Sequence, residues 1–269
     1  MILFLAGTSD ARELAIEIQE AGFSVLASVV TESAVHSLQE AGIRTRMGRL
    51  TAADIAELIV KEGFEAVVDA SHPFAEEASK NAMQGAKEAS VPYIRYEREN
   101  QQFSNEKIVT VRDYQEAAER AAERKGVIML TTGSKTLEIF AKKLVGLENT
   151  RLIARMLPRT DNMEKCEQLG IEQKNIIAIQ GPFSKELNKA LYQQYGVTLM
   201  ITKESGKVGS VDEKLEAALE CGIETIMIAR PNVRYENVHS SFSGVIAELT
   251  KQLTERGQEA WTLKQNLSR

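Results

Sequence analysis

A short turn of small and hydroxyl-bearing residues follows the first apolar run of the chain. Gly7, Thr8 and Ser9 come after residues 2–5 and Ala6, and before an amphipathic stretch. A glycine lets a phosphate approach the backbone, hydroxyl groups donate hydrogen bonds to it, and a helix N-terminus attracts negative charge. The turn therefore predicts a phosphate-binding loop, although helix capping by Ser9 or Asp10 explains it at least as well. With a single glycine, it is not the G-x-G-x-x-G dinucleotide fingerprint.

Two further turns could contact the adenosine end of a dinucleotide. Thr31 and Ser33 follow the second apolar run and suit a phosphate on the ribose 2′ position, whereas Glu32 between them suits a free 2′-hydroxyl. Helix capping is an equally good interpretation of this turn. Arg49 follows the third run beside Gly48 and is a better anion contact than the two arginines within that run. We predict Thr31, Ser33 and Arg49 as cofactor contacts.

The turn after the fourth apolar run combines several unusual residues. Charged Asp69 closes the run, and Ser71, His72, Pro73 and Phe74 follow it, with the proline where a helix would begin. The alternative is that Ser71 caps the helix and His72 is an ordinary surface residue. We favour a functional role because open parallel sheets bind ligands at the carboxyl ends of their strands. Residues 71–74 are predicted cofactor contacts, and His72 is also a candidate catalytic residue.

The second half of the chain repeats this design with more cations. Arg155, Lys203 and Arg230 each follow a different apolar run, and we expect them to meet the carboxylates of an acidic substrate. Lys203 is also a candidate catalytic residue. The full set of predicted substrate contacts is Thr132, Gly133, Ser134, Lys135, Arg155, Ser184, Lys203, Ser205, Gly206 and Arg230.

The overall composition excludes several classes of function. A net charge of −5 leaves no overall positive field that would attract nucleic acid or an acidic membrane. The three histidines lack metal-ligand spacing, and neither C-x-x-C nor a G-x-S-x-G nucleophile motif occurs, so we expect no resident metal. The opening run is too short for a signal peptide and no apolar run is long enough to span a membrane. We expect a cytoplasmic protein, monomeric or weakly dimeric.

Short apolar runs that alternate with amphipathic stretches must position these turns. The runs are apolar on both faces, as is typical of strands covered by helices on both sides. They cover residues 2–5, 24–29, 43–47, 66–69, 93–96, 127–131, 150–154, 176–179, 198–201 and 225–229. Strand–helix alternation of this kind predicts parallel sheets with right-handed crossovers.

The pattern restarts near residue 126, which indicates two domains rather than one wide sheet. We predict an α/β fold with two Rossmann-like, doubly wound parallel-sheet domains, at residues 1–112 and 127–256. Residues 113–126 are the predicted connecting segment. Residues 257–269 are polar for the most part, and we predict an extended or frayed tail.

Taken together, the turns resemble those of a known family. The matching segments are residues 7–12, 69–75, 132–135, 155–158, 181–184, 202–206 and 229–231. In order and spacing they resemble the precorrin-6A reductase family of cobalamin (vitamin B12) biosynthesis, over nearly the whole chain. The resemblance implies two Rossmann-like domains with a nicotinamide cofactor and a corrinoid macrocycle in the cleft between them. It also implies hydride delivery to one double bond of the ring, which gives precorrin-6B or its cobalt form.

The resemblance also implies roles for particular segments. Residues 7–9 match the family's first cofactor loop, where members often have a second glycine at the position of Ala6. Residues 71–74 match a signature near the nicotinamide, with Ser71 where threonine is common. The turns of the second half would face the carboxylates of the corrinoid. NADPH and NADH both remain open, the cobalt form of the substrate is favoured, and no proton donor is identified.

Two functions from other classes remain as alternatives. A non-catalytic two-lobed protein that binds nucleotides or tetrapyrroles would share the architecture but would not turn over a cofactor. A sugar-nucleotide transferase would also have two Rossmann-like halves. Its donor normally binds to the C-terminal half, whereas the small-residue turn at residues 7–9 lies in the N-terminal half.

Overall fold

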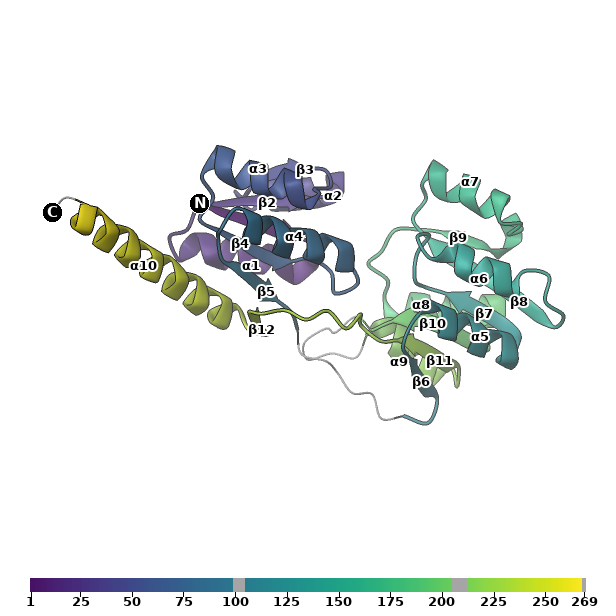
Figure 1. Cartoon of the computed structure of the whole chain (residues 1–269). Coiled ribbons are helices and arrows are strands. Elements are labelled where there is room, and N and C mark those ends of the chain that lie inside the picture. Colours follow the sequence, from purple (N-terminus) through teal and green to yellow (C-terminus); the bar gives the residue numbers. More distant parts are fainter. Residues whose placement is uncertain (99–104, 205–211, 268–269) are drawn as a thin grey trace. The chain divides into compact units, whose positions relative to one another are not determined.

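The computed structural model describes residues 1–98, 105–204 and 212–267 of the chain. The chain divides into two compact units, which we call the first and the second unit. The first consists of Met1–Glu99 and Asn232–Arg269, and the second of Asn100–Pro231. Each unit contains a six-stranded sheet in which neighbouring strands are parallel (Figure 1). The predicted α/β class with two doubly wound parallel sheets is therefore confirmed.

The sheet of the first unit has the strand order β12-β5-β4-β1-β2-β3. Its elements are β1 (Ile2–Ala6), α1 (Ser9–Glu20), β2 (Val25–Val29), α2 (Glu32–Glu40), β3 (Arg44–Met47), α3 (Ala52–Glu62), β4 (Ala66–Ala70), α4 (Glu76–Glu88), β5 (Tyr93–Tyr96), β12 (Val238–His239) and α10 (Phe242–Leu267). β1 lies between β2 and β4 in this order. The crossover from β1 to β2 and the crossover from β4 to β5 therefore run toward opposite edges of the sheet. The turns after β1 and β4 thus form a topological switch point, where open α/β sheets bind ligands.

The side chains of β1 alternate between two apolar cores. Ile2 and Phe4 belong to a buried cluster that includes α1 and α10, whereas Leu3 and Leu5 belong to a second cluster that includes α3 and α4. All four side chains are buried. A strand that is apolar on both faces needs a helical layer on each side, and this requirement explains why these runs lack a polar face.

The sheet of the second unit has the strand order β6-β11-β10-β7-β8-β9. Its elements are β6 (Ile108–Val111), α5 (Tyr114–Arg124), β7 (Gly126–Leu130), α6 (Leu137–Leu144), β8 (Thr150–Met156), α7 (Thr160–Gln168), the 3-10 helix η1 (Gln173–Asn175), β9 (Ile176–Ala178), α8 (Lys185–Tyr195), β10 (Leu199–Lys203), α9 (Glu213–Glu220) and β11 (Glu224–Ile228). The strands β7 to β11 repeat the order of β1 to β5, so the second switch point lies between β7 and β10.

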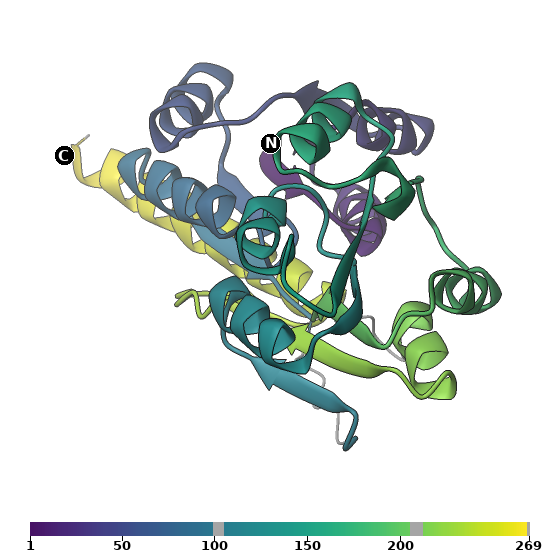
Figure 2. The ribbon, with the colours of Figure 1, turned by 90° about the vertical axis from the view of Figure 1, so that its right-hand side faces the viewer.

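The expected domain boundaries differ from the observed units at both ends of the second unit. β6 pairs with β11 and belongs to the second sheet, although residues 108–111 fall within the expected N-terminal domain. β12 and α10 return to the first unit, and α10 lies against β5 (Figure 2). Residues 257–267, expected as an extended or frayed tail, continue this helix. Local patterns do not reveal which sheet an edge strand joins, because that choice depends on contacts distant in sequence.

Candidate functional site

The turn after β1 and the turn after β4 touch each other. A Cβ atom on Gly7 would lie 2.7 Å from the backbone nitrogen of His72 and 3.0 Å from the Cα atom of Ser71. A side chain at this position would therefore push the two turns apart. The sheet thus brings together the two turns predicted to bind the cofactor, and the packing of the turns is itself a reason for a glycine here.

Helix α1 begins directly after the first of these turns. Thr8 occupies the N-cap position, but its side chain makes no capping hydrogen bond. Its hydroxyl instead hydrogen-bonds with Asp10, which also forms an ion pair with Arg98. Burial raises the pKa of Asp10, but the hydrogen bonds from Arg98 and Thr8 outweigh this effect and hold that pKa below its ordinary value. The negative charge at the start of α1 is therefore balanced by Arg98.

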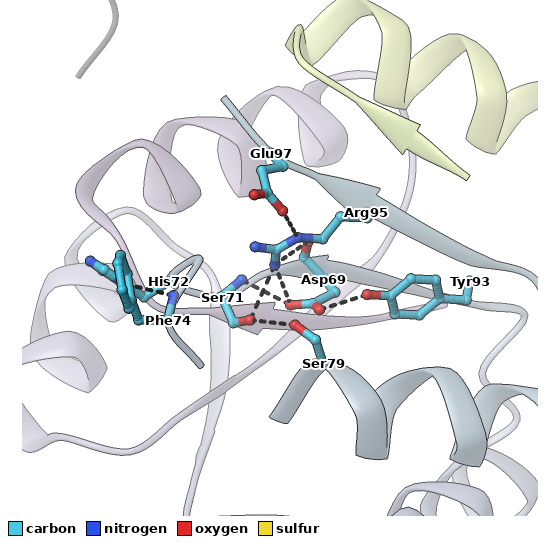
Figure 3. Close-up of polar contacts among 8 residues, drawn as sticks. All are labelled: Asp69, Ser71, His72, Phe74, Ser79, Tyr93, Arg95 and Glu97. Carbon is cyan, nitrogen blue, oxygen red and sulfur yellow. Dashed lines mark hydrogen bonds and ion pairs between the residues drawn. The ribbon is translucent and has the colours of Figure 1, made fainter. Parts of the chain in front are cut away.

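A buried ion pair lies behind the turn after β4 (Figure 3). Nη1 of Arg95 on β5 lies 3.0 Å from Oδ1 of Asp69 on β4, and neither side chain is exposed. The same Nη1 donates to Oγ of Ser71 at 3.2 Å and to the carbonyl oxygen of Asp69 at 3.3 Å. Asp69 accepts from the backbone N–H of Ser71 at 2.9 Å and from the hydroxyl of Tyr93 at 2.7 Å. The pair therefore holds the backbone that leads into His72.

Arg95 has further partners that complete its surroundings. Its Nε lies 3.1 Å from Oε2 of Glu97, and its guanidinium lies 5.1 Å from the ring centroid of Tyr235. Burial favours a lower pKa for Arg95, but the negative charge of Asp69 above all raises it beyond its ordinary value. Removal of one partner from a buried pair of this kind typically costs about 3–5 kcal/mol. The sequence analysis noted Asp69 but missed Arg95, because no local pattern connects two neighbouring strands.

His72 and Phe74 lie on the same side of this turn, and both are partly exposed (Figure 3). The backbone N–H of Phe74 donates to Nδ1 of His72 at 3.2 Å, and the two ring centroids are 5.8 Å apart. Because Nδ1 accepts this hydrogen bond, the neutral imidazole carries its proton on Nε2. The two rings offer a surface against which a flat heteroaromatic group can pack.

The predicted ribose contacts lie at the carboxyl ends of β2 and β3, which are neighbours in the sheet. The hydroxyl of Thr31 accepts a hydrogen bond from the backbone N–H of Ala34 at 3.3 Å and caps α2. This is the structural role that the alternative interpretation predicted. Ser33 and Arg49 are exposed and accessible to a ligand.

The turn after β7, at residues 132–135, lies at the switch point of the second unit. Gly133 has a φ of +80°, in the left-handed region that favours glycine. Thr132 is buried, and its hydroxyl lies 3.2 Å from that of Thr136, at the start of α6. Part of this predicted substrate turn therefore has a structural role within the unit.

Arg155 lies within β8, near its carboxyl end, and is enclosed by its own unit. Its side chain is only 7% exposed, its Nη1 donates to Oδ1 of Asn188 at 2.7 Å, and its guanidinium lies 4.5 Å from the ring centroid of Phe183. Burial lowers the pKa of Arg155. Ser184, also predicted as a substrate contact, accepts a hydrogen bond from the backbone N–H of Leu187 at 3.2 Å and caps α8.

Arg230 follows β11, and Lys203 is the last residue of the adjacent strand β10. The side chain of Arg230 is 4% exposed, and its Nε lies 3.3 Å from Oε1 of Glu204. Lys203 is half-buried, with its Nζ 5.5 Å from the ring centroid of Tyr114. Burial lowers the pKa of Lys203, and the positive charges of Lys135 and Lys214 lower it further.

The strands β11, β10, β7 and β8 are consecutive in the second sheet, so the three predicted cations do lie along one carboxyl edge. Their environments differ, since Arg155 and Arg230 are buried with polar partners of their own. Ser205 and Gly206 lie outside the described residues. Within the described ranges, no three histidine, cysteine or acidic side chains are placed to hold a metal ion.

Comparison with known proteins connects this architecture to a family. Residues 1–250 match the family described as Precorrin-6x reductase CbiJ/CobK. The chain belongs to this family. Membership in the precorrin-6x reductase family makes it an oxidoreductase of cobalamin biosynthesis.

Several relatives within the precorrin-6x reductase family match most of the chain. Cobalt-precorrin-6A reductase of Priestia megaterium is 60% identical over 252 residues, which cover 94% of this chain and 99% of that protein. The protein of the same name from Salmonella typhimurium is 34% identical and covers 86% and 87% of the two chains. Precorrin-6A reductase of Rhodococcus erythropolis is 31% identical and covers 86% and 89%.

A solved structure, CobK precorrin-6A reductase, shares the fold of this member of the precorrin-6x reductase family. It matches with a TM-score of 0.75 and 23% identity, and the alignment covers 93% of this chain and 96% of that chain. In the part of the chain that the structure describes, no helix is both long and apolar enough to cross a bilayer.

Proposed function

We propose that this protein reduces the cobalt-precorrin-6A macrocycle to cobalt-precorrin-6B by hydride transfer from NADPH or NADH, in the cytoplasm. The observation that carries the proposal is the contact between the turns after β1 and β4 at the switch point of the first unit. Doubly wound sheets bind dinucleotides at such a point. The cobalt form is supported by 60% identity to a cobalt-precorrin-6A reductase, against 31% to a precorrin-6A reductase.

The residues of the first unit fit a nicotinamide dinucleotide. The side chain of Thr8 leaves the first amides of α1 uncapped, amides of this kind bind phosphates in other proteins, and Arg98 balances the nearby charge of Asp10. We assign Gly7, Thr8 and Ser9 to the pyrophosphate. Ser33 and Arg49, together with the turn at Thr31, are assigned to the adenosine ribose.

The turn at Ser71, His72, Pro73 and Phe74 is assigned to the nicotinamide, which supplies the hydride when it is bound. The rings of His72 and Phe74 would orient it and exclude water from one of its faces. His72 carries a proton on Nε2 and is our first candidate for a group that touches the reacting atoms.

The substrate is assigned to the carboxyl edge of the second sheet. Lys203 and Lys135 are close enough for their charges to interact, which gives a local positive field in an acidic protein. Lys203 would bind a corrinoid carboxylate and polarise the ring, and it is our second catalytic candidate. Arg155 and Arg230 remain proposed contacts, together with Thr132, Gly133, Ser134, Ser184, Ser205 and Gly206.

Isotope transfer tests the proposed function directly. The reduction adds a hydride to one carbon of a ring double bond and a proton to the other. Purified protein would be incubated with cobalt-precorrin-6A and NADPH or NADH deuterated at the transferable position. We expect one deuterium in the product, seen by mass spectrometry. A corrinoid that binds but remains unreduced with either cofactor would favour the non-catalytic binding protein instead.

The adenosine contact decides between the two cofactors. An arginine–phosphate pair is typically worth about 1.5–3 kcal/mol, and the exposure of Arg49 favours the lower end. Arg49→Ala should therefore weaken NADPH binding more than NADH binding in a fluorescence titration. Equal losses for both cofactors would remove Arg49 from this role.

A further inference from the structure

The chain segment that follows the second unit returns along the edge of the first sheet. The backbone N–H groups of Arg95 and Glu97 donate to the carbonyl oxygens of Asn237 at 2.7 Å and His239 at 3.0 Å. Tyr235, just before this pairing, lies with its ring centroid 5.1 Å from the guanidinium carbon of Arg95. The returning segment therefore covers β5 at the residue that forms the buried ion pair.

Tyr235 and Arg95 both reach the turn after β4. Tyr235 hydrogen-bonds with Ser79 of α4, and Oγ of Ser79 lies 3.3 Å from Oγ of Ser71. Arg95 donates to the same Ser71 hydroxyl at 3.2 Å. Ser71 is thus held from two directions, and it directly precedes His72 (Figure 3).

Stability alone explains this network poorly. Arg95 is 0% exposed, its guanidinium faces the carboxylates of Asp69 and Glu97, and among the described atoms its Nη2 has no hydrogen-bond partner. Buried ion pairs lose much of their attraction to desolvation, and apolar side chains of similar volume often stabilise a fold as well. The geometry that the network imposes on the turn is the better explanation for its presence.

We infer that Arg95 and Tyr235 are positioning residues of the nicotinamide site, which fix the turn at residues 71–74 and thereby orient the hydride-bearing end of the cofactor. This inference rests on the proposed function. Neither residue is assigned a contact with the cofactor, because both act through Ser71 and the backbone around it. The return of the chain from the second unit is therefore a structural part of the cofactor site.

Substitution of Tyr235 tests the inference without removing the buried charge. Tyr195 is a matched control, because its ring likewise lies near an arginine, with the guanidinium carbon of Arg151 5.8 Å from its centroid, and it belongs to neither proposed site. We expect Tyr235→Ala to raise the dissociation constant of the dinucleotide about tenfold, as loss of stacking on a desolvated arginine implies. The corrinoid KM should stay near that of the wild type. Tyr235→Phe keeps the ring near Arg95 but loses the hydrogen bond with Ser79, so its dissociation constant should lie between those of the wild type and Tyr235→Ala. Tyr195→Ala should keep the wild-type affinity.

Unchanged dinucleotide affinity in Tyr235→Ala would overturn the inference, and so would an equal loss in Tyr195→Ala. Arg95→Lys is a second test, since it keeps the positive charge but shortens the reach toward Ser71. It should weaken the dinucleotide in the same way, with less effect on the corrinoid KM. If Arg95→Lys fails to fold, Tyr235→Ala still carries the test.

Hydrogen–deuterium exchange separates this inference from the proposed function. If the wild-type protein binds neither dinucleotide, the proposed function fails, but the positioning of the turn is still measurable. The amides of Ser71, Phe74 and Ala75 should exchange faster in Tyr235→Ala than in the wild type and Tyr195→Ala, whereas those of β1 should not. Equal exchange at the turn in all three proteins would overturn the inference whatever the cofactor does.

Discussion

At the scale of single residues, Lys203 has an environment unlike that of an ordinary surface lysine. It is half-buried beside the ring of Tyr114, and burial together with Lys135 and Lys214 lowers its pKa. Burial and neighbouring positive charges both destabilise the charged form of a lysine. A carboxylate that binds beside the ammonium group stabilises this form and offsets both effects. A polyanionic macrocycle is a ligand that would supply such a carboxylate.

Removal of this charge should affect the substrate and spare the cofactor. We expect Lys203→Gln to raise the corrinoid KM about tenfold or more, as loss of one charged contact implies. The difference from the wild type should shrink at high salt, because screening already weakens the native attraction. Steady-state kinetics at two ionic strengths measure this, with Lys142→Gln, at an exposed lysine of α6, as the control. Loss of dinucleotide affinity with an unchanged corrinoid KM would reverse the roles of the two units.

The lowered pKa of Lys203 also predicts a pH dependence. The ammonium form binds carboxylates, and it is lost as the pH rises through the lowered pKa, which lies below that of an exposed lysine. The corrinoid KM of the wild type should therefore rise with increasing alkalinity. Lys203→Arg should show a flatter profile, because arginine stays protonated throughout. Identical pH profiles for the two proteins would mean that Lys203 does not bind the substrate.

At the scale of elements, the packing of α4 on α3 supports the turn that precedes α4. A Cβ atom on Gly85 would lie 2.6 Å from Cγ2 of Ile55 and 2.7 Å from the carbonyl oxygen of Ala52. The glycine therefore lets the two helices approach closely on one face of the first sheet. Because α4 begins just after the turn at residues 71–74, its position also bears on the candidate cofactor site.

Substitution of this glycine should destabilise the protein. We expect Gly85→Ala to lower the free energy of unfolding by about 1–3 kcal/mol, because the added carbon overpacks the contact between the helices. Urea unfolding followed by circular dichroism measures the change. Gly257→Ala in α10 is the control, since a Cβ atom there meets no other atom within 4 Å. A loss of the same size in the control would point to a general effect of helix composition.

The strands were predictable because each carries its own signal. All ten expected strands occur, and in most of them a buried apolar run such as residues 66–68 reports its burial locally, although β3 is partly exposed. β6 and β12 were not predicted as strands, because they are short edge strands with partly exposed side chains. The turns at Gly7 and His72 were found because strand ends are visible in the sequence. The contact between these two turns and the role of Arg95 were not found, because both depend on which strands become neighbours.

At the scale of the whole molecule, the two units have separate apolar cores and carry different candidate sites. A ligand that binds only folded protein stabilises the unit to which it binds, by about 2.7 kcal/mol at a concentration one hundred times its dissociation constant. Saturating dinucleotide should therefore slow hydrogen exchange in the first unit, most at residues 7–10 and 71–75. The corrinoid should slow exchange in the second. Protection of the second unit by the dinucleotide would contradict the assignment.

The first unit is built from both ends of the polypeptide, and this has a consequence for how the protein is made. Val245 and Leu249 of α10 belong to the same buried cluster as Ile2 and Phe4 of β1. On the ribosome, the N-terminal segment emerges first, yet its core is completed only after the entire second unit has been translated. Until then, an apolar face of the nascent first sheet is uncovered, so the unit whose synthesis begins first is the last to have its core completed.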